Sequence, residues 1–369
     1  DEIIFTINSG QSQNLNIRNG IVKLKDLDSD FENAEVFLEI FSGNQDVIKY
    51  LDVSPIDKKK FSKLRNIKGD TKIDLNLKFP LLIDLPAERI IYESNVAIVD
   101  STFQDILNNH DLNDFYLNIQ INNSKVSYKG GGNIFNSNTE FSGVQSNINE
   151  EFTDEIKGKY TLKRSFSEYF FPEGDFIIQG ESEILYNIIE DENGFSKIEG
   201  LGNLENLNLK SDFLGPNLDF NNGKLRFLIR PYDKSFSGFA DIKTKNLNVE
   251  VNSIFNLIKL IELDVQTFKS PKQDFNLKYE GENNKFSINA NKLSLDSFDI
   301  FEEDNLKIEN FELDLKINDF KIGGMKFSNS IIYAKKLNNF FQKISVSLVG
   351  ENDFHNLSIS DEEANKEFI

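Results

Sequence analysis

The sequence predicts a mostly β protein built on an elongated antiparallel sheet, with a few short helices. Apolar and polar residues alternate through most of the chain, turn-forming residues recur between the alternating runs, and few segments have a helical period. The alternation is clear in residues 310–322, where Phe311, Leu313, Leu315 and Ile317 are separated by polar residues. Successive side chains of a strand point to opposite faces. The pattern therefore predicts a sheet with one apolar face and one hydrated face.

Alternating runs recur at short intervals, and Asn, Asp, Gly and Ser, which favour turns, separate them. Short strands joined by tight turns are typical of an antiparallel meander and not of a parallel sheet interleaved with helices. The expected strands are residues 15–24, 36–41, 73–79, 96–99, 115–121, 160–162, 204–209, 225–229, 247–251, 275–279, 286–290, 306–317 and 344–348. The expected turns contain Asn19-Gly20, Asn44, Asn122-Asn123, Gly130-Gly131-Gly132, Asn193-Gly194, Asn222-Gly223 and Gly323-Gly324.

Helical signals are confined to a few segments. Residues 44–51 and 57–64 are expected as two short helices, and residues 103–107 as one helical turn. The clearest signal begins at Ser253, which can cap a helix with an apolar stripe. We expect this helix to plug the end or side of the sheet, because it has too little positive charge to bind an anionic membrane. The stripe consists of Ile254, Leu257, Ile258 and Ile261.

No domain boundary is sharp in the sequence. Phe171-Pro172-Glu173-Gly174 is the most plausible seam, so we expect one sheet segment over residues 1–171 and a second over 172–360. Residues 361–369 lose the alternation and are expected to form a frayed tail. The chain begins within a strand-like pattern, without a start Met or a signal peptide. We therefore expect a fragment of a longer protein, or a chain cleaved upstream.

Composition and charge exclude several classes of function. The net charge of -19 argues against binding to nucleic acid, whose phosphates favour clustered Lys and Arg. An acidic surface instead keeps a sheet-rich protein soluble. The absence of Cys excludes disulfides, thiolate zinc sites and Cys nucleophiles. No run of roughly 18 apolar residues is present that could form a transmembrane helix.

Residues with catalytic chemistry form no recognisable cluster. His110 and His355 are isolated from each other and from metal-ligand spacings, so both are expected at the surface. Residues 130–132 are three glycines, but they lack the Lys-Ser/Thr pair of a phosphate loop. Carboxylates are so common that no single pair is informative. We therefore predict that the protein is not an enzyme and has no catalytic residues, no metal site and no cofactor.

One region has a more specific pattern. It comprises residues 15–31, 34–43, 69–81, 96–103, 112–119 and 126–132, and its third segment ends in Phe79-Pro80-Leu81. This order resembles the AsmA-like proteins of Gram-negative envelopes, particularly the large YhdP-type members. In those proteins a strand ending in Phe-Pro-Leu is followed by a helical or irregular passage and by further alternating strands. The resemblance covers roughly residues 10–165, and its motifs are structural.

The resemblance implies a bridge-like lipid-transport protein. Its long antiparallel sheet would curl into a β-taco-like groove that crosses the periplasm and supports outer-membrane integrity. The apolar concave face would shield the acyl chains of phospholipids or other acyl lipids, which are the implied partners. The implied location is the periplasm, with anchoring in the inner membrane by one N-terminal helix that is not found in residues 1–369. A departure from the family pattern is therefore the missing anchor, and a C-terminal portion is also expected to be missing.

Parity along the predicted strands identifies candidate residues that line such a groove. Each could instead pack against a second sheet or against the helix expected at Ser253, because alternation reports burial and not what covers the residue. The candidates are Ile73, Leu75, Leu77, Phe79, Phe115, Leu117, Ile119, Ile121, Leu225, Phe227, Ile229, Phe311, Leu313, Leu315 and Ile317.

Three other functions stay open at this point. A structural or adhesive β-rich surface protein predicts a regular repeat and a filled interior, whereas the sequence has no strict period. An assembly factor for outer-membrane proteins is another alternative within the envelope. An enzyme on a β scaffold predicts polar side chains that converge in one pocket.

Overall fold

Strands dominate the computed structural model. It describes residues 1–12, 14–28, 32–53, 65–107, 110–148, 151–170, 177–191, 194–211, 215–220, 222–256, 259–295, 310–338, 340–350 and 354–360. Contacts divide the chain into two units. Unit 1 comprises Asp1–Thr161 and Asn187–Phe195, and unit 2 comprises Leu162–Tyr186 and Ser196–Ile369. The seam expected at Phe171–Gly174 lies outside the described residues, as does the tail expected at 361–369.

Unit 1 is an antiparallel meander in which each strand from β3 to β9 pairs with the next one along the chain. Strands β1 and β2 both pair with β3. The strands are β1 (Glu2–Ile7), β2 (Gly10–Ser12), β3 (Leu15–Lys25), β4 (Asn33–Gly43), β5 (Ile67–Pro80), β6 (Ile91–Leu107), β7 (His110–Asn122), β8 (Lys125–Ile134), β9 (Ser137–Ile148) and β10 (Glu151–Lys163). Helix α1 (Asn44–Val53) and the 3-10 turn η2 (Ala87–Arg89) lie in two of the connections.

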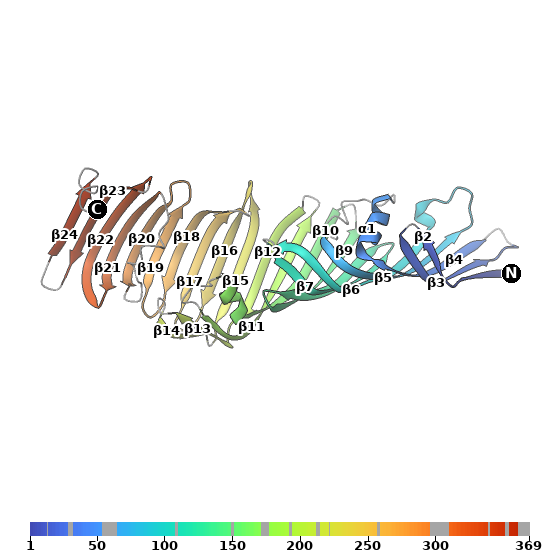
Figure 1. Ribbon diagram of the computed structural model, residues 1–369, viewed down its shortest axis with the longest axis horizontal. Coiled ribbons are helices and arrows are strands. Elements are labelled where there is room, and N and C mark those ends of the chain that lie inside the picture. Colours follow the sequence, from blue (N-terminus) through green and yellow to red (C-terminus); the bar gives the residue numbers. More distant parts are fainter. Residues whose placement is uncertain are drawn as a thin grey trace. The chain divides into compact units, whose positions relative to one another are not determined.

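Unit 2 contains a second ladder, in which β15 to β24 lie next to one another in chain order (Figure 1). Strand β12 pairs with β15, and β13 pairs with both β11 and β14. The elements are α2 (Arg164–Phe170), β11 (Ile177–Asp191), β12 (Gly194–Asn203), β13 (Leu207–Ser211), β14 (Gly215–Asp219), β15 (Lys224–Tyr232), β16 (Ser235–Lys243), β17 (Asn248–Phe255), β18 (Leu260–Lys269), β19 (Asp274–Glu280), β20 (Lys285–Ser294), β21 (Phe311–Ile322), β22 (Met325–Leu337), β23 (Phe340–Val349) and β24 (Phe354–Ser360). The end of β11 from Asn187 and the start of β12 up to Phe195 belong to unit 1.

The predicted fold class is confirmed, because the described chain is mostly β, its sheet is open and it has two α-helices. One pair departs from the antiparallel pattern: β20 and β21 are parallel, and Lys285 lies opposite Glu312. A parallel pair requires a connection of about a dozen residues or more to return the chain to the same end. Residues 296–309, which lie outside the described part, connect these two strands.

The helix predicted at Ser253 is wrong, because β17 ends at Phe255 and β18 begins at Leu260; Leu257 and Ile258 of the predicted stripe lie outside the described residues. Ser253 pairs with Gly238 on one side and with Leu263 on the other. The chain reverses at Asn256, whose side-chain Oδ1 accepts a hydrogen bond from the backbone N of Lys259 at 2.9 Å. The apolar residues of this segment fit both a helical period and an alternating period, and pairing with β16 and β19 favours the strand.

The other helix predictions have different outcomes. The helix over residues 44–51 is confirmed as α1, and the one over 57–64 lies outside the described residues. The helical turn at 103–107 is wrong, because Phe103 belongs to β6 and pairs with both Ile67 and Leu112. Long-range pairing decides this segment, which a local pattern does not reveal.

Two predicted turns lie inside strands. Gly20 is in β3, and residues 130–132 are in β8. A Cβ atom at Gly130 would lie 2.6 Å from the carbonyl oxygen of Tyr116, so glycine lets β7 and β8 approach closely here. The expected strand at 204–209 is also interrupted: a turn closed by the Leu207 N–H and the Leu204 carbonyl separates β12 from β13.

Three predicted turns are confirmed, and two have other outcomes. Turns at 122–123, 222–223 and 323–324 join consecutive strands. Gly323 and Gly324 both have positive φ, of 55° and 79°, which glycine adopts without strain. Asn44 instead begins α1, and Asn193 lies outside the described residues.

Candidate functional site: an apolar sheet face

Mostly apolar side chains form three rows across unit 2, and the exceptions are Gly238, Ser253 and Ser330. Residues directly opposite each other on neighbouring strands share one face of the sheet. Strands β15 to β22 each contribute one residue to every row. The first row is Leu225, Ile242, Val249, Phe268, Phe275, Ala290, Ile317 and Ser330; the second is Phe227, Ala240, Val251, Val265, Leu277, Ile288, Leu315 and Ile332; the third is Ile229, Gly238, Ser253, Leu263, Tyr279, Phe286, Leu313 and Ala334.

Unit 1 has a comparable row. It crosses β3 to β10 and is apolar except for the hydroxyl of one tyrosine. The predicted residues Leu75, Leu77 and Phe79 share its face, because they lie two, four and six residues beyond its member Ile73 on β5. The row consists of Ile17, Ile40, Ile73, Val96, Ile119, Tyr128, Gly143 and Ile156.

All fifteen candidate residues from the sequence are at least half-buried. Phe115, Leu117, Leu315 and Ile317 are buried. The half-buried candidates are Ile73, Leu75, Leu77, Phe79, Ile119, Ile121, Leu225, Phe227, Ile229, Phe311 and Leu313.

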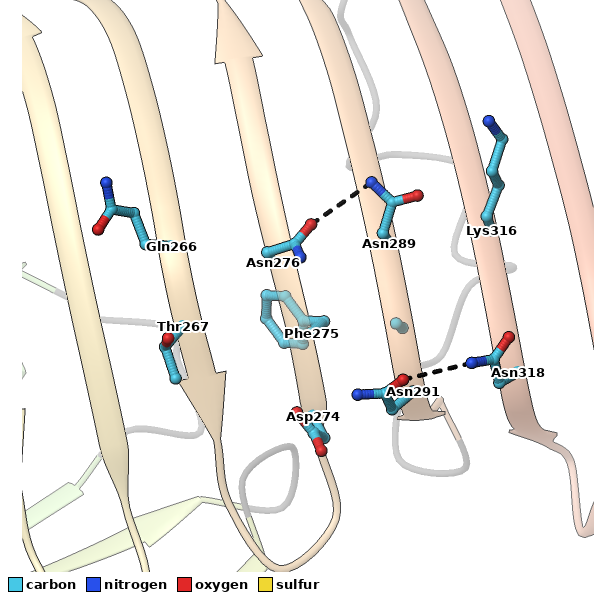
Figure 2. Close-up of a pocket in the computed structure, with 10 residues that line it drawn as sticks. Gln266, Thr267, Asp274, Phe275, Asn276, Asn289, Asn291, Lys316 and Asn318 are labelled. Atoms are coloured by element: carbon cyan, nitrogen blue, oxygen red, sulfur yellow. Dashed lines mark hydrogen bonds between the residues drawn. The ribbon is translucent and has the colours of Figure 1, made fainter.

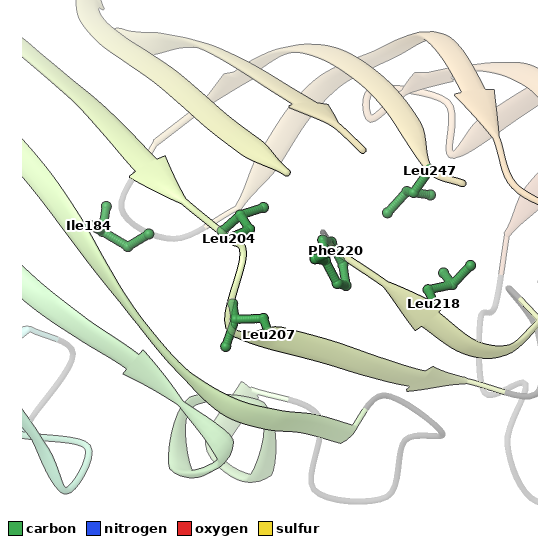
Figure 3. Close-up of a cluster of buried hydrophobic side chains, with 6 residues drawn as sticks. All are labelled: Ile184, Leu204, Leu207, Leu218, Phe220 and Leu247. Carbon is green, nitrogen blue, oxygen red and sulfur yellow. The ribbon is translucent and has the colours of Figure 1, made fainter. Parts of the chain in front are cut away.

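A second layer covers part of the face of unit 2. Figure 3 shows Leu207 of β13 and Leu218 of β14 in one buried cluster with Ile184 of β11. Leu225 and Phe227 pack against this cluster, and so do the first-row residues Ile242, Val249 and Phe268. The cluster that contains β13 and β14 side chains therefore covers the first row from β15 to β18, and the candidates Leu225 and Phe227 pack against protein there.

The face over β19 to β23 is packed differently. Its buried cluster includes Ile317, Leu315 and Phe320, and all of its members come from β19 to β23 or from the adjoining Leu295. Ile317 is 1% exposed and Phe320 is 2% exposed, yet these side chains contact neighbours on their own face and no described second layer. Such lateral burial is typical of a sheet that curves toward its apolar face, since curvature brings the side chains of that face together.

The apolar face of unit 2 is closed at one end of its strands. Leu247, Gln273, Leu293 and Phe320 are all buried there. The Gln273 side chain donates through Nε2 to the Ser294 carbonyl at 2.8 Å and accepts at Oε1 from the Ser294 N–H at 3.0 Å. This exchange fixes the β18–β19 turn against the end of β20, and we call this end the closed end.

The opposite end of the same strands is exposed, and we call it the open end. Tyr232, Leu260, Leu337 and Phe341 lie there and are between 37% and 55% exposed. Aromatic pairs line the apolar face near this end. They are Phe236–Phe255, Tyr279–Phe286 and Phe311–Phe341, with ring centroids 5.9, 4.7 and 6.1 Å apart.

Unit 1 has the same contrast between strand ends. At the start of β5, Ile67 is fully buried, and Asn44 of α1 donates from Nδ2 to its carbonyl at 2.9 Å. Thr71 donates from its hydroxyl to Asn44 Oδ1 at 3.1 Å, so α1 is tied to this end of the sheet. At the other end, after β5, Ile83 and Ile91 are exposed.

One polar atom within the apolar row of unit 1 is the hydroxyl of Tyr128. The Tyr128 hydroxyl donates to Asp154 Oδ1 at 2.7 Å. Burial raises the pKa of Tyr128, and the neighbouring Asp154 carboxylate raises it further. The tyrosine therefore keeps its proton and acts as a hydrogen-bond donor.

The hydrated face of unit 2 presents amides and ion pairs. Figure 2 shows Asn289 donating to Asn276 Oδ1 at 3.4 Å and Asn318 donating to Asn291 Oδ1 at 3.3 Å along a shallow pocket. These four amides bridge β19, β20 and β21. They stabilise the hydrated face, and Thr267, Asp274 and Lys316 also line this pocket.

Asp241 is the most buried charge on that face. Its Oδ2 accepts from Arg226 Nη2 at 2.6 Å and from Lys243 Nζ at 3.2 Å. Burial opposes ionisation of Asp241, but the two cations outweigh it and hold its pKa below the usual value. The carboxylate therefore stays ionised as part of a structural ion cluster.

The described residues contain no group of three or more His, Cys, Asp or Glu side chains that could hold a metal ion. His110 begins β7 and its ring lies 5.1 Å from that of Phe135, whereas His355 is exposed on β24. Among the helices of the described segments, none is long and apolar enough to span a membrane.

Comparisons with protein-family models, with curated proteins and with solved structures found no match for this chain.

Proposed function

We propose that the protein binds the acyl chains of lipids along its apolar rows and forms a periplasmic segment of a lipid-transport bridge between the inner and outer membranes. The observation that carries the proposal is the run of apolar rows from β15 to β22, which receives a described second layer over β15 to β18 and none over β19 to β22. The envelope location, the phospholipid cargo and the inner-membrane anchor come from the resemblance to AsmA-like proteins.

The chemistry of the rows suits a lipid tail. Transfer of one methylene group from water to an apolar surface is worth about 0.8 kcal/mol, so a tail can bind without a specific polar partner. In the second row the side chains of neighbouring strands are similar, as in Leu277, Ile288 and Leu315. Similar neighbours give similar binding energy from strand to strand, which favours movement along the rows over trapping at one position.

A structural or adhesive role is the alternative function. The two functions differ in whether lipid or protein covers the apolar face. In that role the rows would be covered by protein. The test is native mass spectrometry of the purified chain, followed by solvent extraction and analysis of the released lipids. We expect acyl lipids to copurify at close to one or more per chain, with the bound mass lost on extraction. A chain that carries no lipid, and takes up none when incubated with phospholipid, would refute the proposal.

A further inference from the structure

One lysine lies on the apolar face of unit 2 at the open end. Lys336 of β22 pairs with Phe311 of β21 on one side and with Phe341 of β23 on the other. Its ammonium nitrogen is 5.9 Å from the centroid of the Phe341 ring, within the range of a cation–π contact. The rings of Phe311 and Phe341 meet edge to face with centroids 6.1 Å apart.

The local backbone holds Lys336 in this position. The register between β22 and β23 shifts between Lys335 and Lys336, where the chain approaches its turn. The turn is fastened to the start of β21, because the backbone N–H of Asn338 donates to Asn310 Oδ1 at 2.7 Å. These contacts keep Lys336 beside Phe311.

The surroundings of Lys336 differ from those of the neighbouring lysines. Lys335 lies on the hydrated face, opposite Glu312 and Lys343. On that same face Lys285 forms an ion pair with Glu312 at 3.4 Å. In the described part of the chain, Lys336 has aromatic neighbours and no carboxylate within ion-pair distance. A half-buried cation among aromatic rings is best stabilised by an anion that comes from outside the chain.

We propose that Lys336, with Phe311 and Phe341, binds the headgroup of an acyl lipid that has a net negative charge and whose tail lies on the apolar rows. This assignment rests on the proposed function and adds the headgroup class and the position at which it binds. Along β22 the next residues on the same face are Ala334 and Ile332, which belong to the third and second rows. A lipid with its anionic headgroup at Lys336 therefore places its tail directly on the rows, while the headgroup stays at the exposed end.

Two single-chain lipids with the same tail test this site. Oleoyl lysophosphatidylglycerol has a net negative headgroup, and oleoyl lysophosphatidylcholine has a zwitterionic one. Each is titrated below its micelle concentration against the purified chain loaded with N-phenyl-1-naphthylamine, a neutral dye that fluoresces on apolar surfaces. The variants are Lys336→Gln and, as a matched control, Lys335→Gln, which removes the same charge from the opposite face of the same strand.

In the unmodified chain we expect the anionic lipid to displace the dye at about one fifth of the concentration needed for the zwitterionic lipid, the size of effect that a partly exposed ion pair gives. Lys336→Gln should bring the two concentrations to within about twofold by weakening the anionic lipid alone. Lys335→Gln should keep the fivefold ratio.

The contradicting outcomes separate the two proposals. If Lys336→Gln keeps the same ratio as Lys335→Gln, or weakens both lipids equally, the headgroup site is wrong and acyl binding stands. If neither lipid displaces the dye from the unmodified chain, acyl binding fails and the headgroup site fails with it.

Discussion

Replacement of Leu313 by Gln tests the apolar rows with little disturbance of the core. Leu313 is half-buried and lies in the third row, between Phe286 and Ala334. Its neighbour two residues on, Leu315, is only 7% exposed, so a polar group there would be buried and would destabilise the fold itself. Position 313 can instead accept a polar amide that still reaches water.

The expected loss of affinity follows from the surface that Leu313 offers to a tail. A tail that crosses the third row places about three methylene groups against this side chain, and full burial is worth about 0.8 kcal/mol for each. Only one side of the tail faces the sheet, so about half of that energy, or about 1.2 kcal/mol, is lost with Gln. This corresponds to an increase in Kd of about eightfold.

Fluorescence titration with cis-parinaric acid, which emits when its tail leaves water, measures this Kd directly. The matched control is Ile331→Gln. Ile331 is 50% exposed, lies on the hydrated face of β22 and pairs with Lys316 and Ser347. We expect Ile331→Gln to change the Kd by less than twofold. A folded Leu313→Gln chain with unchanged Kd, or equal losses in both variants, would refute the assignment of the binding face.

Two further predictions concern the sheet of unit 1. Gly130→Ala should lower the free energy of unfolding by about 1–3 kcal/mol in chemical denaturation, because the new Cβ would lie 2.6 Å from a backbone oxygen. Gly10→Ala is the control: its new Cβ would have its nearest contact at 3.8 Å, so the free energy of unfolding should change by less than about 0.5 kcal/mol. Equal changes in both variants would contradict the close approach of β7 and β8. Glu35 should titrate with a pKa of about 2, because Lys25 and Lys78 donate to its carboxylate. Since this folded pKa lies below the unfolded value of about 4.3, the stabilisation is present above pH 4.3 and is lost as the pH falls toward 2. Carbon-13 NMR should show this low midpoint and its return toward the ordinary value in the Lys25→Gln, Lys78→Gln double variant; an ordinary midpoint in the unmodified chain would contradict the ion pairs.

The alternation predicts which residues share a face but not which segments pair. Residues 73–79 and 311–317 show this well, because each lies within a single strand with the expected inward parity. The segment around Ser253 satisfies a helical period as well as an alternating one, and only its partners, Gly238 and Leu263, decide between them. Neither partner is adjacent in sequence, so the competing helix could not be excluded from the sequence alone.

For the candidate site too, the sequence predicts which face a residue lies on but not what packs against it. Parity along Ile332, Ala334 and Lys336 places the lysine on the apolar face, so a signal for it was present in the sequence. The adjacent Lys335 made that signal ambiguous, since either lysine could have faced water. The covering of Leu225 by β13 and β14 depends on long-range packing, which alternation does not report.

Photo-crosslinking with a palmitic acid that bears a diazirine at mid-chain tests the central claim most directly, because the label marks the side chains that touch the tail. After irradiation, digestion and mass spectrometry, we expect the label on the second and third rows of unit 2, at residues such as Ile288 and Leu313. We also expect excess unlabelled oleate to remove it. Labelling confined to hydrated-face residues such as Ile331, or labelling that oleate does not reduce, would contradict the account.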